Sequence, residues 1–132
     1  MVVANEYDGQ AAAWDSDAGV VYRPLAQALV ASSPIPLAAR LVLDVGSGTG
    51  AVAHAAEAVG ARVVTSDRSC DMVAFQTGRW PAVAADVVTL PFRDGGFDAA
   101  LAGFVLNHLA PVAALSEMIR VVRPGGVVLA ST

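Results

Sequence analysis

Apolar residues along this chain fall into short continuous runs that alternate with longer segments of helical period. The runs predict five β-strands, at residues 41–45, 62–66, 82–85, 97–102 and 127–131. The segments between them predict helices at 51–59, 70–77 and 111–122, and an earlier amphipathic segment opens at Pro24 and ends within 32–36. Apolar strands that alternate with helices are typical of a parallel sheet covered on both faces. We therefore predict a doubly wound α/β fold.

Spacing within the helical segments predicts which face of each lies against the core, because apolar residues three and four positions apart share one face. The predicted buried residues are Leu25, Ala28 and Leu29 in the first helix, Val52, Ala55, Ala56 and Val59 in the second, and Val112, Leu115, Ile119 and Val122 in the last. Ser69 is predicted to cap the helix at 70–77. Gly60 and the run RPGG at 123–126 are predicted to end the two helices that precede them.

The length of 132 residues is typical of one domain. We predict a single domain over 1–132, with an N-terminal arm and helix at 1–36 and a cofactor-binding core at 41–132. Hydrophobic residues make up 55% of the chain and charged residues 15%, which indicates a folded chain with many buried strands.

Charge and cysteine content exclude several classes of protein. The net charge of −4 comes from eight arginines, no lysines and twelve acidic residues, so no basic face is available for nucleic acid. Cys70 is the only cysteine, which excludes an internal disulfide and a cysteine-rich zinc site, and we predict no metal site. The start MVVANEYDG lacks the pattern of a signal peptide, and polar residues interrupt the longest low-charge stretch. We therefore expect a cytoplasmic protein without a membrane partner.

The run LVLDVGSGTG at residues 41–50 carries the strongest chemical signal. An apolar strand delivers Asp44 to the mouth of a loop with glycines at 46, 48 and 50. Glycine lets the backbone turn sharply and approach a ligand, and the helix that follows offers free N–H groups. This pattern predicts a cradle for a nucleotide-type cofactor. The carboxylate suits a cofactor with cationic groups, such as the ammonium and sulfonium of S-adenosylmethionine.

The same loop also satisfies the relaxed dinucleotide pattern G-x-G-x-x-G/A, so a nicotinamide cofactor is an alternative. Asp67 lies 21 residues beyond Gly46, the position of an acid that binds ribose hydroxyls in either cofactor class. Asp44 would repel a pyrophosphate by roughly 1 to 4 kcal/mol at a few ångströms. Arg68, next to Asp67, is a candidate clamp for a 2′-phosphate, which Asp67 would repel. Adenosylmethionine meets neither conflict.

Five segments together resemble the class I S-adenosylmethionine-dependent methyltransferases, particularly the small-molecule and ubiquinone-biosynthesis-like branch, whose fold is Rossmann-like. LVLDVGSGTG resembles the first motif of that family, and VVTSD resembles the strand that ends in its ribose-binding acid. ADVVTLPF is similar to the third-strand segment, and FDAALAGFVLNHL and RVVRPGGVVLAS to the fourth and fifth strands. The resemblance covers roughly residues 5–132 and implies S-adenosylmethionine as the cofactor.

The resemblance also implies roles for individual residues. The methionine part of the cofactor would be held by the loop and the backbone around it, at Asp44, Gly46, Ser47, Gly48 and Gly50. The ribose hydroxyls would bind Asp67. The adenine amino group would donate to Asp86 beside the Val87 N–H, and Phe104 would lie near the methionyl side. Arg68 departs from the family, which more often has an apolar residue there, and its planar guanidinium is expected to stack on adenine.

Methyl transfer is an in-line displacement, so the chief contribution of the protein is to align the acceptor with the methyl carbon. A base is needed only when the acceptor must lose a proton. His108, after the fourth predicted strand, is the candidate base. His54 falls on the polar face of the helix at 51–59, where we expect it to be solvated.

The last residue, Thr132, falls at the end of the fifth predicted strand, whereas the family continues through a helix and an antiparallel strand pair that shape the acceptor pocket. We therefore expect that pair to be absent and the strand at 127–131 to be an exposed edge, which favours a homo-oligomer or a completing chain. Three functions stay open. They are methyl transfer to a small-molecule acceptor, non-catalytic binding of S-adenosylmethionine, and NAD(P)-dependent oxidation or reduction.

Overall fold

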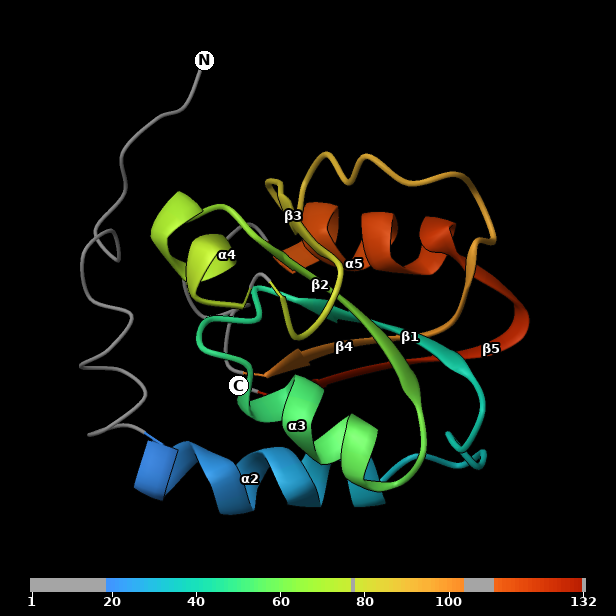
Figure 1. Cartoon of the computed structure of the whole chain (residues 1–132). Coiled ribbons are helices and arrows are strands. Elements are labelled where there is room, and N and C mark those ends of the chain that lie inside the picture. Colours follow the sequence, from blue (N-terminus) through green and yellow to red (C-terminus); the bar gives the residue numbers. More distant parts are fainter. Residues whose placement is uncertain (1–18, 77, 104–110, 132) are drawn as a thin grey trace.

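The computed structural model describes residues 19–76, 78–103 and 111–131, with side chains from Val21 onward, and contains one sheet of five parallel strands (Figure 1). Its strand order is β3-β2-β1-β4-β5. The strands are β1 (Leu41–Val45), β2 (Arg62–Asp67), β3 (Ala82–Ala84), β4 (Phe97–Gly103) and β5 (Val122–Ser131). The helices are α2 (Gly19–Ala31), α3 (Ala51–Ala58), α4 (Cys70–Gln76) and α5 (Pro111–Val121). The prediction of a doubly wound α/β fold is confirmed.

Helices cover both faces of the sheet. Figure 1 shows α2 and α3 on one side and α5 on the other. Successive residues of β1 divide between the two sides: Val42 belongs to the apolar cluster under α2 and α3, and Leu43 to the cluster under α5. Both side chains are fully buried, which explains why a strand with two covered faces has a continuous apolar sequence. No helix in the described parts of the chain has the length and apolar character needed to cross a membrane.

The predicted inner face of α5 is partly correct, since Leu115 and Val122 are half-buried against the core. Val112 and Ile119 are 77% and 64% exposed, whereas Ala114, Met118 and Val121 are fully buried. The buried face therefore overlaps the predicted one but is centred on Ala114, Met118 and Val121. Apolar residues occupy most sides of this helix, so their spacing alone selects no face. The cluster under α5 includes the small residues Ala100 and Ala102 of β4, against which Met118 packs.

Helix α2 also differs from its prediction. Pro24 lies inside the helix and does not open it. The helix continues through the proline with one fewer backbone hydrogen bond, since proline has no N–H. Its buried residues are Ala26, Leu29 and Val30, whereas Leu25 is 43% exposed and Ala28 is exposed. In α3 the predicted face is correct except for Val59, which is the C-cap and is 48% exposed.

Strand β5 begins at Val122, directly after α5, and not at 127 as predicted. Phe97 pairs with Val122 and Ala99 pairs with Val127, so residues 123–126 bulge opposite Asp98 alone. A Cβ at Gly126 would clash with the carbonyl oxygen of Asp98, which explains the glycine at this position. The RPGG run therefore forms a bulge within the strand's span and does not separate a helix from a strand.

The bulge is anchored by the carboxylate of Asp98. It accepts hydrogen bonds from the Leu41 N–H at 2.8 Å and from Arg123 Nε at 2.5 Å. These two bonds, the first contributing more, lower the pKa of Asp98. The anchor ties the start of β1 to β4 and β5, and so fixes the strand that delivers Asp44 to the opposite edge of the sheet.

Candidate functional site

The glycine loop follows β1 at the carboxyl edge of the sheet. Gly46, Gly48 and Gly50 have φ angles of 65°, 56° and 100°, which side chains rarely tolerate. The loop is anchored to β2 by the Ser47 N–H, which donates to the carbonyl of Ser66 at 3.0 Å. A Cβ added at Gly48 would meet no atom of the described residues within 4 Å, so these residues leave space beside its Cα. The predicted glycine loop is present, and a ligand can approach it from that side.

Asp44 lies buried beneath the start of α3 and is 1% exposed. Its Oδ2 accepts a hydrogen bond from the N–H of Ala53 at 3.0 Å, which satisfies one of the free N–H groups of the first helical turn. Its Oδ1 has no hydrogen-bond partner in the described parts of the chain. Burial raises the pKa of Asp44 well above its usual range, the Ala53 hydrogen bond opposes this, and the charge of Asp67 adds to it.

Asp67 joins the glycine loop to the turn after β2. One oxygen accepts the Gly48 N–H at 2.8 Å and the other accepts the Ser69 N–H at 2.8 Å. The side chain is 9% exposed. A carboxylate oxygen has two lone-pair directions and can accept more than one hydrogen bond. Ser69 caps α4 as predicted, since its Oγ accepts the Met72 N–H at 3.3 Å.

Asp86 follows β3 at the same edge of the sheet. The Ala85 N–H donates to the backbone carbonyl of Asp67 at 3.0 Å. Asp86 is the next residue, so its backbone lies close to that of Asp67. Asp86 is exposed, and its Oδ1 accepts the Val88 N–H at 3.1 Å. The side chain of Val87 is buried in the core under α5. Arg68 is exposed directly after Asp67. The structure thus brings Asp44, the glycine loop, the pair Asp67–Arg68 and the pair Asp86–Val87 to one edge of the sheet.

Two predicted residues lie outside the described residues. Phe104 follows Gly103, the last described residue of β4, and His108 falls between β4 and α5. Their roles near the methionyl group and as a base therefore stay predictions.

Sequence reasoning missed two residues that contact the loop. Gln76, at the end of α4, is 2% exposed, and its amide nitrogen donates to Ser47 Oγ at 2.9 Å and to the carbonyl of Gly48. Trp80 is 6% exposed, and its ring would lie 2.7 Å from a Cβ added at Gly50. The only sequence signal was a polar residue at the end of an amphipathic helix, followed by an aromatic residue before a strand.

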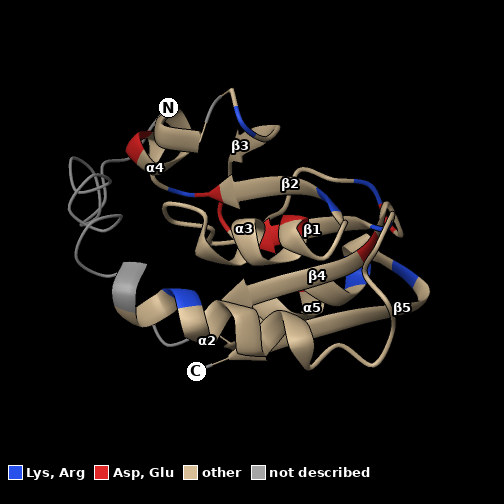
Figure 2. Ribbon diagram, turned by 60° about the horizontal axis from the view of Figure 1, so that its bottom comes forward, with Lys and Arg blue, Asp and Glu red and all other residues tan. Residues whose placement is uncertain are grey.

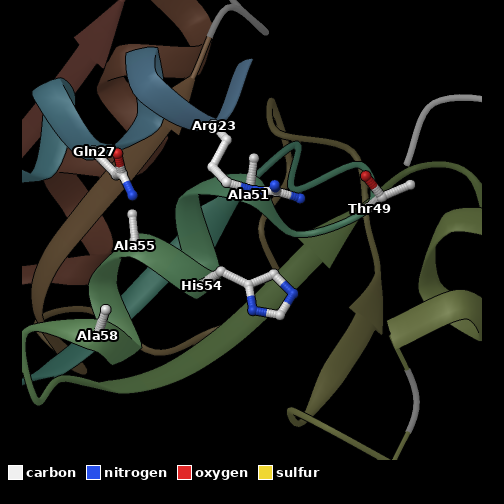
Figure 3. A pocket seen from close by; sticks show the side chains of 7 residues that line it. All are labelled: Arg23, Gln27, Thr49, Ala51, His54, Ala55 and Ala58. Carbon is white, nitrogen blue, oxygen red and sulfur yellow. The ribbon is translucent and has the colours of Figure 1, made fainter. Parts of the chain in front are cut away.

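His54 is exposed, as predicted, but it is not without contacts. Its ring packs edge-on against Trp80 with ring centres 4.7 Å apart. His54 also lines a recess of about 110 Å³ between α2 and α3, together with Thr49 and Arg23 (Figure 3). In Figure 3 the side chain of Arg23 extends from α2 toward the start of α3. The recess therefore adjoins the glycine loop on the side of α3.

Both edges of the sheet carry charges of both signs: Asp98 pairs with Arg123 at the amino edge, and Arg68 follows Asp67 at the carboxyl edge (Figure 2). Arg40, Arg62 and Arg123 lie at the starts of β1, β2 and β5, away from the glycine loop. Asp44 and Asp67 lie at the carboxyl ends of β1 and β2. Two neighbouring acids and the Oδ1 of Asp44, which has no partner among the described residues, favour a cationic group at this edge. The arrangement suits a ligand that carries such a group.

Comparison with known proteins identifies a matching family. Residues 43–130 match the family described as a methyltransferase domain, and this range runs from β1 to β5. A demethylmenaquinone methyltransferase from Beutenbergia cavernae is 47% identical over 89 residues, which cover 64% of this chain and 37% of the relative. The chain spans less than half the length of the curated relatives it matches.

Two solved structures share the fold over almost the whole chain. One is a complex between the Haloferax volcanii Trm112 methyltransferase activator and a methyltransferase, with a TM-score of 0.80, 27% identity, and coverage of 97% of this chain and 60% of the other. The second, from Methanococcus maripaludis, is described as an S-adenosyl-L-methionine-dependent methyltransferase. It has a TM-score of 0.77, 19% identity, and coverage of 99% and 67%. At that identity the second comparison bears on the fold alone.

Replacing Asp44 by Asn tests the electrostatic cost of this site. Because the pKa of Asp44 is raised in the folded state, the folded protein holds a proton that the unfolded chain loses near pH 4. The stability of the protein therefore falls as the pH rises above about 4 through the contribution of this group. In Asp44→Asn we expect that contribution to vanish, so the variant gains stability relative to the parent from about pH 4 to 7. Urea unfolding of both proteins across this range measures the difference, and parallel pH profiles would contradict it.

Proposed function

This chain belongs to the methyltransferase domain family, which its residues 43–130 match, and from this membership we propose that it binds S-adenosylmethionine and takes part in methyl transfer to a small-molecule acceptor. The observation that carries the proposal is the buried carboxylate of Asp44, whose Oδ1 lacks a partner among the described residues beside an open glycine loop. A buried anion without a counter-charge is costly. A cofactor with cationic groups offsets that cost, whereas a pyrophosphate increases it.

The proposed binding roles follow the edge of the sheet. The loop at Gly46, Ser47, Gly48 and Gly50, with Asp44 behind it, holds the methionine part. The carboxylate of Asp67 binds the ribose hydroxyls, since a carboxylate oxygen can accept more than one hydrogen bond. Adenine lies beyond β3, within reach of Asp86 and the Val87 N–H, with the exposed guanidinium of Arg68 stacked on it. Phe104, which lies outside the described residues, is proposed to contact the methionyl side.

S-adenosylmethionine supplies a methyl group on a sulfonium, which is already a good leaving group. The task of the chain is therefore orientation. Helix α3 and the glycine loop orient the methionine part of the cofactor. Asp67 orients the ribose, and its own position is fixed by its bonds to the N–H groups of Gly48 and Ser69. When the acceptor must lose a proton, His108 takes it.

Relatives favour one of the three functions that the sequence left open. The family match favours methyl transfer over the nicotinamide-dependent alternative. The curated relatives are named demethylmenaquinone methyltransferases, so we propose a small molecule of the quinone class as the acceptor. Since the chain spans less than half of these relatives, the acceptor is a proposal about the reaction in which this domain takes part.

Strand β5 supports a proposal about partners. It forms one edge of the sheet that the described residues build, and its residues from Val127 to Leu129 are apolar and only half-buried. An edge strand of this kind accepts a further strand. We propose that a second copy or another chain pairs with it. One solved structure that shares the fold is a complex with an activator protein, and it gives a precedent for a partner chain.

Titration of the purified chain with S-adenosylhomocysteine, the demethylated product, tests the cofactor class. We expect saturable binding that falls by about 10- to 100-fold in Asp67→Ala, because the ribose hydroxyls lose charged acceptors. Asp94→Ala is the matched control, since Asp94 pairs with Arg120 away from the site and its side chain is 82% exposed. Its affinity should stay within about twofold of the parent. A folded chain that binds NADH and not S-adenosylhomocysteine refutes the proposal.

The role of His108 is tested by the pH dependence of methyl transfer to demethylmenaquinone. Because the ordinary pKa of a histidine side chain is about 6.5, a histidine base becomes competent as the pH rises through neutrality. We expect His108→Ala to lower the rate on the order of 100-fold and to remove the rise between about pH 6 and 8. A variant that keeps the full rate across this range excludes His108 as the base.

Pairing at β5 predicts association that depends on protein concentration. Sedimentation of the purified chain over a concentration series should show a growing dimer population. A single monomeric species at every concentration would count against a second copy at this edge, and would leave only a different chain as the proposed partner.

A further inference from the structure

The end of α4 and the segment after it contact the glycine loop. Gln76 is the last residue of α4, and Trp80 precedes β3. They are joined to each other by a hydrogen bond from the Trp80 N–H to the Gln76 carbonyl at 3.4 Å. Gln76 lies 28 residues from Gly48 in the sequence, so these contacts are made only by the fold.

Gln76 bonds to the polar groups of the loop. Its amide nitrogen donates to Ser47 Oγ and to the carbonyl of Gly48, and the Ser47 hydroxyl donates to its amide oxygen at 3.1 Å. Asp67 meanwhile accepts the Gly48 N–H. Both backbone groups of Gly48 are therefore held by side chains from outside the loop. A buried amide is costly unless it is hydrogen-bonded, so Gln76 and the loop stabilise each other's conformation.

Trp80 constrains the last glycine of the loop. A Cβ at Gly50 would clash with the indole ring, so the ring closes the space beside the Cα of Gly50. The ring is itself fixed, because its Nε1 donates to Glu57 at 2.8 Å and His54 packs on its edge. The hydrogen bond from Trp80 is the main cause of the lowered pKa of Glu57, so this bond stabilises the ionised form of the acceptor. Trp80 is thus anchored to α3, the helix that follows the loop.

We propose that Gln76 and Trp80 are positioning residues that hold the glycine loop in its ligand-binding conformation before the cofactor arrives. The proposal rests on the proposed function, since the ligand is S-adenosylmethionine. Neither residue is assigned a contact with the cofactor. They act through Ser47, Gly48 and Gly50, and a loop that is already ordered spares the ligand the entropic cost of ordering it.

Binding of S-adenosylhomocysteine by calorimetry tests the proposal in Gln76→Met and Trp80→Leu. We expect each to weaken binding by about tenfold or more, because the loop loses contacts that fix its conformation. Trp80→Phe keeps a ring against Gly50 and should restore affinity to within about threefold of the parent. Phe75→Ala is the matched control, because Phe75 is on the same helix but is 46% exposed, and it should bind like the parent.

Amide hydrogen exchange in the ligand-free protein supplies a second readout that needs no cofactor. Exchange at residues 47–50 should rise about tenfold in Gln76→Met and Trp80→Leu, and stay at the parent level in Phe75→Ala. If the parent itself fails to bind S-adenosylhomocysteine, the proposed function fails while the exchange data still decide the positioning role. If either variant fails to fold, the other decides. Cooperatively folded variants with parental affinity and parental loop exchange overturn the proposal.

Discussion

The buried carboxylate of Asp44 is the constraint on which the site depends. It accepts an N–H of the first turn of α3, and so joins the end of β1 to the start of the helix across the glycine loop. The same burial that makes this bond strong leaves Oδ1 without a partner in the described structure. The chain therefore carries an electrostatic cost at this position in the absence of a ligand. A bound cation that reduces this cost gains affinity from the same charge that destabilises the free protein.

Much of the fold follows from short-range patterns. Strands of a parallel sheet are covered on both faces, so β1 and β4 stand out as largely apolar runs, whereas β2 has the mixed sequence RVVTSD. Glycine is strongly favoured where φ is positive, as at Gly46, Gly48 and Gly50. These patterns also place Asp44 and Asp67 correctly at the carboxyl edge of the sheet. The buried faces of the helices are harder to predict from the sequence. In α5 apolar residues lie on most sides, and the packing of Met118 against the small side chains of β4 decides which of them are buried.

The contacts of Gln76 and Trp80 could not have been predicted from the sequence. No local pattern distinguishes a glutamine that is buried against a distant loop from one that is exposed at a helix end. The partners of Gln76 are 28 and 29 residues away, and they approach only because β2 lies beside β1 in the sheet. The short length of β3 and the bulge in β5 could not be predicted either, since the limits of a strand depend on the strand with which it pairs.

The glycine loop combines openness to a ligand with restraint by the protein. Open space at Gly48 and the positive φ angles let a ligand approach the backbone, but glycine also has the largest conformational freedom to lose on folding. Side chains from other elements therefore have to supply the order that the loop sequence lacks. Asp67 holds the N–H of Gly48, Gln76 holds its carbonyl, and Trp80 closes the space at Gly50. Because these three residues come from β2, from α4 and from the segment before β3, the order of the loop depends on the packing of that half of the sheet.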